Sequence, residues 1–273
     1  MNVVSIRRYP VKSMMGEDMN ACEITDLGLL GDRAYGVVDI ETGKLANAKN
    51  PKKWPEMFQY LASFTAEPET TKPMPPVKIT LPDGSSVNST DQLVNKRLTD
   101  SFKRNVMLAA PTQSMTEFEI FTPEGIEELD NPGQVFSSTS PKNTFFDSAM
   151  VHIITTATID ALGELAPTSR IEARRFRPNL IIDVPDEKGF VEESWIGSSI
   201  TIGNDVKLKI IKPTSRCVMT TLAQGDLPND MNVLRTLAQK NKGNFGVYAE
   251  VVTTGKVRIG DTVEIGKTKI LEM

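Results

Sequence analysis

The sequence predicts a mainly β protein with some helices, an α+β chain built from two barrel-like domains. Three observations carry this prediction. Short extended segments separated by glycine-rich turns fill most of the 273 residues, a pattern typical of β-barrels. Residues 199–211 alternate apolar and polar side chains around Gly203-Asn204-Asp205, which indicates a β-hairpin. Few segments show helical periodicity, so helices are expected to be few.

The first predicted domain spans residues 1–110. We expect strands over residues 3–9, 21–25 and 34–40, where extended segments are bounded by turns. A helix is expected within residues 91–104, because apolar residues recur there at helical spacing. These elements predict an N-terminal β-barrel-like domain.

The second predicted domain spans residues 142–268 and follows a connector at 111–141, which is rich in Pro, Gly and Ser. A buried strand is expected at 148–155 and a helix at 156–165. A further helix is predicted over residues 231–240.

Composition excludes several classes of protein. The net charge of −4 and the pI near 5.3 argue against a nucleic-acid-binding protein. The N-terminus has no apolar signal-peptide core, and no run of 18 apolar residues predicts a membrane span. Two cysteines far apart in sequence do not make a disulfide framework. A reducing cytoplasm is the expected location.

Cys217 is the strongest candidate for chemistry. Residues 213–216 are expected to form a polar turn, and residues 218–222 an extended β-branched segment, which would place the thiol at the mouth of a strand. A thiolate is a soft metal ligand, and Arg216 directly before it would favour the anion. The alternative is ordinary, because free cysteine is most often a small buried hydrophobe.

A metal at Cys217 would need ligands that the chain lacks. Structural zinc takes about four protein ligands, whereas this chain has one histidine, His152, and one further cysteine, Cys22. If Cys217 binds a metal, most other ligands must therefore arrive with a cofactor. His152 lies in an apolar run and is interpreted as a structural core residue.

Three positions could bind an anion. Lys12 and Ser13 offer an ammonium and a hydroxyl in one turn, unless Lys12 is simply solvated. Arg33 could form an anion fork or only a salt bridge with Asp32. The segment 174–179 holds three arginines in four places, which form either an anion cluster or a solvated edge. Pro178 is expected to keep Arg177 extended.

These segments, in this order, resemble the MOSC proteins. That family takes its name from the C-terminal domain of molybdenum-cofactor sulfurases and includes the amidoxime-reducing component. Residues 9–13 and 28–33 resemble its N-terminal β-barrel domain. A second set of segments resembles the MOSC domain itself: residues 175–179, 215–221, 244–247 and 259–261.

The resemblance implies a pterin cofactor that carries molybdenum on a dithiolene, with Cys217 as the protein's thiolate ligand. This would answer the shortage of ligands. It also implies a shared task for the polar candidates, which would hold the phosphate and pterin by charge-assisted hydrogen bonds. The implied cofactor-binding residues are Lys12, Ser13, Arg33, Arg175, Arg177, Asn179, Ser215 and Arg216.

The implied activity is a two-electron reduction that removes oxygen from small N-hydroxylated or similar N–O substrates. The sequence ends without a ferredoxin-like cysteine cluster, so a separate ferredoxin- or cytochrome-type donor is expected. The pyridoxal-phosphate domain of true sulfurases is also absent from it. Residues 222–226 depart from the reductase branch, which leaves the substrate class open. Two alternatives to reduction also remain. Cys217 could carry sulfur as a persulfide, or the chain could only carry the cofactor.

Overall fold

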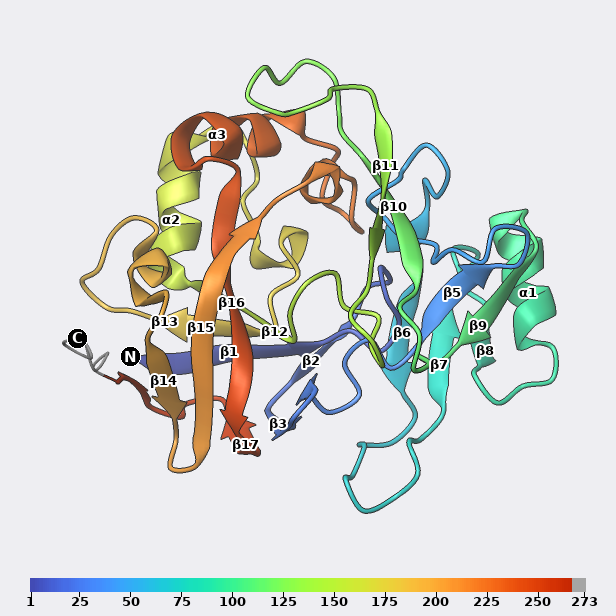
Figure 1. Ribbon diagram of the computed structural model, residues 1–273, viewed down its shortest axis with the longest axis horizontal. Coiled ribbons are helices and arrows are strands. Elements are labelled where there is room, and N and C mark those ends of the chain that lie inside the picture. Colours follow the sequence, from blue (N-terminus) through green and yellow to red (C-terminus); the bar gives the residue numbers. More distant parts are fainter. Residues whose placement is uncertain (267–273) are drawn as a thin grey trace.

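The structure is a computed structural model that describes residues 1–266, and it is mostly strands with three α-helices, as predicted. The strands between residues 151 and 265 lie with the first strands of the chain on one side of the molecule, and those between residues 36 and 139 lie on the other (Figure 1). The predicted end of the second domain, residue 268, lies outside the described residues.

The largest sheet has eight strands and combines both ends of the chain. Its order is β18 (Val263–Ile265), β14 (Ser199–Ile202), β15 (Val206–Ser215), β16 (Asn244–Thr253), β12 (Val151–Thr155), β13 (Leu180–Asp183), β1 (Asn2–Arg8) and β2 (Glu17–Met19). Only β12 and β13 pair in parallel; the other pairs are antiparallel. The hairpin predicted around Gly203 is confirmed as β14–β15.

This sheet curls but is not a closed barrel. An isolated bridge pairs Asn2 with Thr262, and backbone hydrogen bonds join Val3 to Gly260 and Asp261, and Met1 to Val263. The start of β1 therefore lies against the segment that enters β18. Among residues 1–266, no ladder joins the end strands β18 and β2. Apolar side chains of the strands, such as Ile153, Leu208 and Val247, form the core inside the curl.

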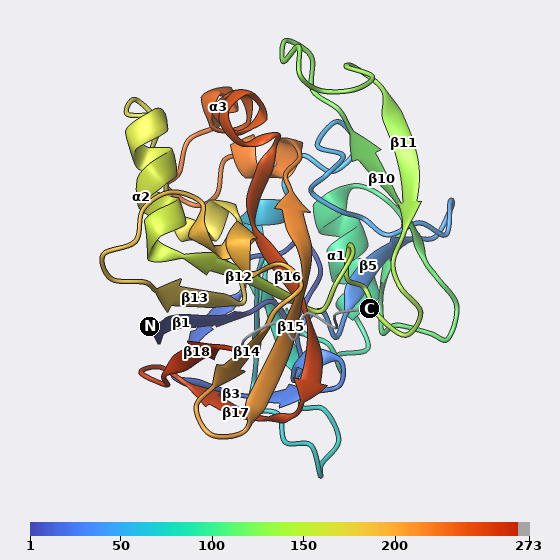
Figure 2. The ribbon, with the colours of Figure 1, turned by 60° about the vertical axis from the view of Figure 1, so that its left-hand side comes forward.

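Two helices pack against each other and against this sheet (Figure 2). The predicted helix 156–165 is confirmed as α2 (Thr156–Leu165), where the Thr155 hydroxyl accepts a hydrogen bond from the Thr158 N–H. The other predicted helix is α3 (Met231–Asn241), capped by the Asp230 carboxylate. Asp230 bonds the Asn232 N–H at 3.0 Å.

A three-stranded sheet, β17–β3–β4 (Gly255–Arg258, Ala21–Thr25, Gly28–Leu29), adds Cys22, Ile24, Leu29 and Val257 to the core of the large sheet. The first half of the chain also forms two short sheets around a separate core, β6–β7–β8 (Leu61–Phe64, Val77–Thr80, Ser86–Asn88) and β5–β9 (Gly36–Asp39, Val106–Ala109). Helix α1 (Val94–Phe102) lies within the predicted range 91–104. The structure also contains four short 3-10 turns within residues 1–266: η1 (Met57–Gln59), η2 (Ala173–Arg175), η3 (Val191–Trp195) and η4 (Val218–Thr221).

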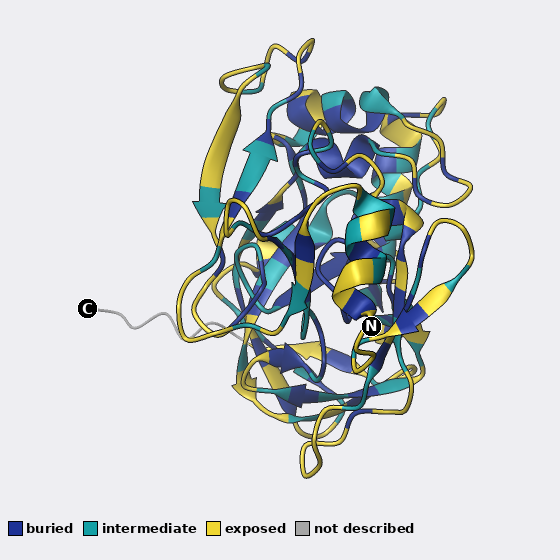
Figure 3. Ribbon diagram, turned by 90° about the vertical axis from the view of Figure 1, so that its right-hand side faces the viewer, coloured by how far each residue is buried: buried dark blue, intermediate teal, exposed yellow. Residues whose placement is uncertain are grey.

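The predicted connector contains a β-hairpin. Strands β10 (Glu117–Phe121) and β11 (Val135–Thr139) pair antiparallel within residues 111–141. The polar composition concealed them because β11 is largely exposed, as its yellow ribbon shows (Figure 3). A bridge from Leu45 to Phe118 attaches this hairpin to the first half of the chain.

The segment after Cys217 is not extended as predicted. Strand β15 runs to Ser215, and Val218–Thr221 form the 3-10 turn η4. Threonine hydroxyls favour this turn because they bond local backbone carbonyls: Thr220 bonds the carbonyl of Cys217 at 3.1 Å, and Thr221 that of Val218 at 2.8 Å.

Turn η4 joins the two halves of the molecule. Its Met219 belongs to the apolar core of the first half, together with Val11, Phe58 and Tyr60. Cys217 and Leu222 pack against the same core. Cys217 therefore lies where the two halves meet. Within residues 1–266, no helix is long and apolar enough to cross a bilayer.

Candidate functional site

Cys217 lies at a junction between a strand and a turn, with a half-buried thiol. It directly precedes η4, with φ −130° and ψ −176°, and is a free cysteine. Its neighbours Ser215 and Arg216 line the same hollow of about 500 Å³, which we call the thiol hollow. The thiol is therefore open to a ligand, unlike that of Cys22, which is almost fully buried.

Cationic side chains from four segments of the chain meet beside Cys217. Lys12, Arg33, Arg177 and Arg216 line a small cavity of about 50 Å³, which we call the cation cavity. This cavity is large enough for a small ion or a few waters. Arg216 lines both the cation cavity and the thiol hollow, so the two spaces meet at that residue.

Lys12 and Lys49 share one carboxylate, that of Asp147. The Lys12 Nζ lies 2.5 Å from Asp147 Oδ1 and donates to the Phe145 carbonyl at 2.6 Å. The Lys49 Nζ lies 3.1 Å from Asp147 Oδ2. Burial, opposed in part by Asp147, lowers the pKa of Lys12 to about 8. Lys12 is therefore buried in the site rather than solvated, and its charge titrates near neutral pH.

Arg33 pairs with Asp32, the local salt bridge that was one of its two predicted alternatives. Its guanidinium also lies 4.6 Å from the Tyr9 ring centroid and lines the cation cavity. The other Asp32 contacts are the Tyr9 N–H at 2.8 Å and the Asn179 amide at 2.9 Å. Both ends of the Asn179 amide have partners within the protein, because its Oδ1 also accepts from the His152 N–H at 3.1 Å. Asn179 thus positions Asp32.

Arg177 and Arg216 are buried, and within residues 1–266 neither has a carboxylate partner. Arg177 donates to the Met14 carbonyl at 2.7 Å and stacks 4.0 Å from the Tyr9 ring centroid. Burial lowers the pKa of Arg177 to about 10. Arg216 donates to the Phe176 carbonyl at 2.8 Å, while its buried Nε has no hydrogen-bond partner in the part of the chain that the structure describes.

The site therefore holds more positive than negative charge. Five cations, Lys12, Arg33, Lys49, Arg177 and Arg216, share the carboxylates of Asp32 and Asp147. Among the described residues, the last two arginines have no carboxylate within 4.0 Å, and Asp147 neutralises only one of its two lysines. Buried charges without partners are costly, so this arrangement favours a bound anion.

The cation cavity also concentrates unusual backbone. Ser13, Arg33 and Arg177 have φ angles of 63°, 50° and 56°, in the left-handed region that non-glycine residues rarely adopt. Arg177 therefore departs from the extended geometry expected before Pro178. Such conformations cost about 1–3 kcal/mol each and concentrate at functional sites. All three residues line the cavity.

The two serines are placed differently. Ser13 lines the cation cavity, and its Oγ accepts from the Ala48 N–H at 3.1 Å, which leaves its proton available to donate. Ser215 is exposed and lines the thiol hollow. The predicted serines therefore lie in neighbouring spaces.

Arg175 lies apart from the other predicted residues. Its guanidinium donates to the backbone carbonyls of Arg170, Leu222 and Pro228, at 3.0, 3.4 and 2.9 Å. It does not line the cation cavity. Its surroundings indicate that Arg175 holds the loop after η4 in place and do not support the cofactor contact expected of it.

His152 lines the cation cavity, but its ring nitrogens face the carbonyls of Arg177 and Phe245 at 3.4 and 3.3 Å. Burial and the charge of Arg216 hold the pKa of His152 well below its usual range, so the ring is neutral. These contacts support the structural role predicted for it. Gly246 allows the close approach, since a Cβ there would lie 2.6 Å from His152 Nε2.

Sequence reasoning missed Lys49, Asp147 and Tyr248. Lys49 lines the thiol hollow, and the other two line the cation cavity. Each is a single polar residue without a neighbouring motif, so no local signal identified it. The described residues contain no group of three or more His, Cys, Asp or Glu placed to hold a metal.

Comparison with known proteins identifies both halves of the chain. Residues 140–264 match the MOSC domain, and residues 1–105 match the MOSC N-terminal beta barrel domain. Human mitochondrial amidoxime-reducing component 1 is 24% identical over 281 residues, covering 93% of this chain and 80% of that protein. Bos taurus mitochondrial amidoxime reducing component 2 is 25% identical over 295 residues, with the same coverages of 93% and 80%.

Among solved structures, the YUAD protein from Bacillus subtilis aligns with a TM-score of 0.48 and 12% identity, over 97% of this chain and 94% of that one. The two family matches lie in the order expected from the sequence motifs. The chain therefore belongs to the MOSC proteins and carries the family's N-terminal β-barrel domain ahead of its MOSC domain.

Proposed function

We propose that this protein binds the molybdenum cofactor through Cys217 and reduces small N-hydroxylated or similar N–O compounds. One observation carries the proposal: an excess of buried positive charge lies beside a half-buried, accessible thiol. The amidoxime-reducing components among its relatives support the same reaction class.

The residues present fit such a group by their chemistry. Lys12, Arg33, Arg177 and Arg216 would hold its anionic phosphate end by charge-assisted hydrogen bonds, and the unpartnered Arg216 Nε offers one such donor. Ser13 would add a hydroxyl. Cys217 would bind molybdenum, because a thiolate suits a soft site. Ser215 would lie on the substrate side, and Asn179 would act by positioning Asp32.

When bound, the cofactor would supply the redox chemistry, and the protein would supply binding and orientation. The reaction balances as an N–O bond plus two electrons and two protons, giving an N–H bond and water. A separate ferredoxin- or cytochrome-type protein would deliver the electrons, and solvent the protons. We place this chemistry in the reducing cytoplasm, where Cys217 would stay unoxidised.

We also propose that the chain has two domains, residues 1–110 and 142–268, joined by the connector at residues 111–141.

Sulfur transfer is the second candidate, because a persulfide carrier would also need the free, half-buried thiol of Cys217. Simple cofactor carriage is less well supported. A carrier has no need of a substrate space, whereas a hollow of about 500 Å³ adjoins this thiol.

The test is to purify the protein from a host that makes the pterin cofactor, measure molybdenum, and assay benzamidoxime reduction with a chemically reduced viologen. The proposal predicts molybdenum near one per chain at full loading, and benzamidine as product. Molybdenum without reduction would indicate a carrier. A persulfide on Cys217, seen by intact mass in metal-free protein, would favour sulfur transfer.

A further inference from the structure

The thiol hollow has two unlike sides. Lys49, Ser215, Arg216 and Cys217 form the polar side. The β10–β11 hairpin and its loop form the other side, which is mostly apolar (Ile120, Phe121, Pro123, Leu129 and Phe136) and also includes Thr122, Asp130 and Asn131. Its volume, about 500 Å³, lies within the range of about 300–1,000 Å³ typical of small-molecule sites. The arrangement offers an apolar surface directly beside the thiol.

The apolar wall is one face of a hairpin. Ile120 and Phe136 are direct cross-strand partners, so their side chains lie together on that face. Phe118, two residues before Ile120, shares the face and is fully buried. The Lys12 and Lys49 ammonium groups lie 4.6 and 5.3 Å from its ring centroid. The same face therefore extends from the cationic site to the thiol hollow.

Phe136 stands out on this wall. Its side chain is 48% exposed, although phenylalanine is usually buried. An exposed aromatic ring that lines a hollow next to a candidate reactive centre has free surface available for a ligand. Phe121 also lines the hollow, but its ring, like that of Phe118, is buried and has an ammonium group over it.

We propose that the thiol hollow is the substrate chamber and that Phe136 and Ile120 select substrates with a flat aromatic or broad apolar group next to the N–O function. This inference rests on the proposed function and specifies its substrate class. Small hydrophilic N–O compounds gain nothing from the wall, because they bury little apolar surface on it. An aromatic ring gains area burial and ring–ring contact with Phe136.

The first test needs no cofactor. Protein from a host that cannot make the pterin is alkylated with iodoacetamide, and modification of Cys217 is followed by peptide mass spectrometry. Benzamidoxime should slow alkylation, and acetamidoxime at the same concentration should not. Cys22 is an internal reference: it should stay unmodified while the protein is folded, since burial raises the pKa of its thiol to about 12.

Variants in the same assay test whether Phe136 belongs to the surface that binds the aromatic ring. Phe136→Ala should raise the half-protecting concentration of benzamidoxime about tenfold, and Phe136→Leu should give an intermediate value. Val135→Ala is the matched control, because Val135 is 47% exposed on the same strand but does not line the hollow. Equal protection by both amidoximes, or an unchanged Phe136→Ala, would overturn the inference.

A second test uses the cofactor-loaded protein. Phe136→Ala should raise KM for benzamidoxime about tenfold with kcat within about twofold, and leave KM for acetamidoxime unchanged. If loaded protein reduces neither compound, the proposed function fails, while the alkylation test still reports on the chamber. If it reduces both with equal KM, the function stands and the assigned chamber is wrong.

Discussion

Two buried arginines in this protein have opposite surroundings. Arg8 is 2% exposed and pairs with Glu17 at 2.8 Å and with Glu67 at 3.0 Å. Burial would lower its pKa, but the hydrogen bonds and charges of Glu67 and Glu17 raise it above the usual value. Arg177 is 4% exposed and has no carboxylate partner among the described residues, and burial lowers its pKa to about 10.

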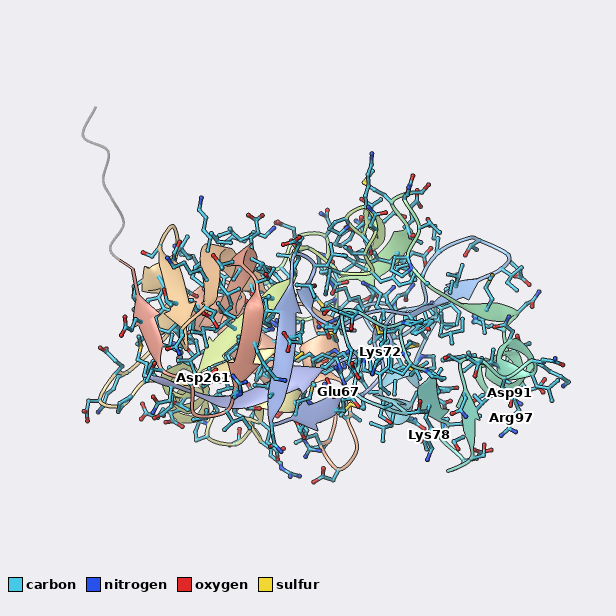
Figure 4. All side chains as sticks on the ribbon, turned by 90° about the horizontal axis from the view of Figure 1, so that it is seen from below. Glu67, Lys72, Lys78, Asp91, Arg97 and Asp261 are labelled. Atoms are coloured by element: carbon cyan, nitrogen blue, oxygen red, sulfur yellow. The ribbon has the colours of Figure 1, made fainter. Side chains whose placement is uncertain are left out.

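The difference separates a structural arginine from a functional candidate. The Arg8 region also adjoins a hollow, of about 610 Å³, yet its carboxylates already neutralise the arginine. Glu67, which belongs to that region, is labelled near the middle of the underside (Figure 4). The Arg177 region is short of negative charge, so a ligand can supply it. Cavity volume alone would favour the Arg8 region, whose hollow is larger than the thiol hollow and the cation cavity.

The largest expected effect is a difference in the sign of stability changes. In cofactor-free protein, Arg8→Met should lower the free energy of unfolding by about 3 kcal/mol, because it leaves Glu17 without its buried partner. Arg177→Met should leave it unchanged or raise it by about 1–3 kcal/mol, since it removes an unpaired buried charge. Urea unfolding midpoints at constant m-value measure both. A loss in Arg177→Met equal to that in Arg8→Met would break the comparison.

Retention of the cofactor, unlike stability, should be lost when the charge of Arg177 is removed. Arg177→Gln should reduce molybdenum per chain about 10- to 100-fold under limiting cofactor, because hydrogen bonds to charged groups are worth about 1.5–3 kcal/mol. The measurement is elemental analysis after extensive dialysis.

Arg174→Gln serves as the control for that experiment. Arg174 lies three residues before Arg177, in η2, and pairs with Glu172 and Asp226, at 2.7 and 2.6 Å. It should keep the wild-type metal content. If both variants retain molybdenum equally, Arg177 does not hold the cofactor.

A smaller effect should follow pH. The pKa of Lys12, about 8, lies below the 10.5 of an unperturbed lysine, so its charge is lost as pH rises through about 8. Inorganic phosphate should therefore bind cofactor-free protein more weakly at pH 9 than at pH 7, by up to about tenfold per unit. Calorimetric titration measures this dependence. Lys12→Arg should give a flatter profile, because arginine stays charged. A wild-type profile as flat as that of the variant would remove Lys12 from the site.

Sequence patterns correctly predicted the helices and hairpins that are specified by residues close together in the chain. Helix α2 and the β14–β15 hairpin matched because periodicity and turn residues specify them. The extended structure predicted after Cys217 was wrong, since Thr220 and Thr221 use their hydroxyls to close a turn. Hairpin β10–β11 was missed because its exposed strand carries little apolar signal.

The candidate site was partly predictable. Lys12, Arg33 and Arg177 were identified as cations near turns, and the fold brings them together. Arg175 and Arg177 could not be told apart by sequence, because the left-handed backbone at Arg177 sends the two side chains to different places. Lys49 and Asp147 depend on contacts between distant segments, which no local motif encodes.

X-ray absorption at the molybdenum edge tests the central claim most directly. Loaded wild-type protein should show one more sulfur in the metal's first shell than Cys217→Ala loaded with the same cofactor. The cations are intact in the variant, so it should still retain some pterin. An identical sulfur count in the two proteins would show that Cys217 does not bind the metal.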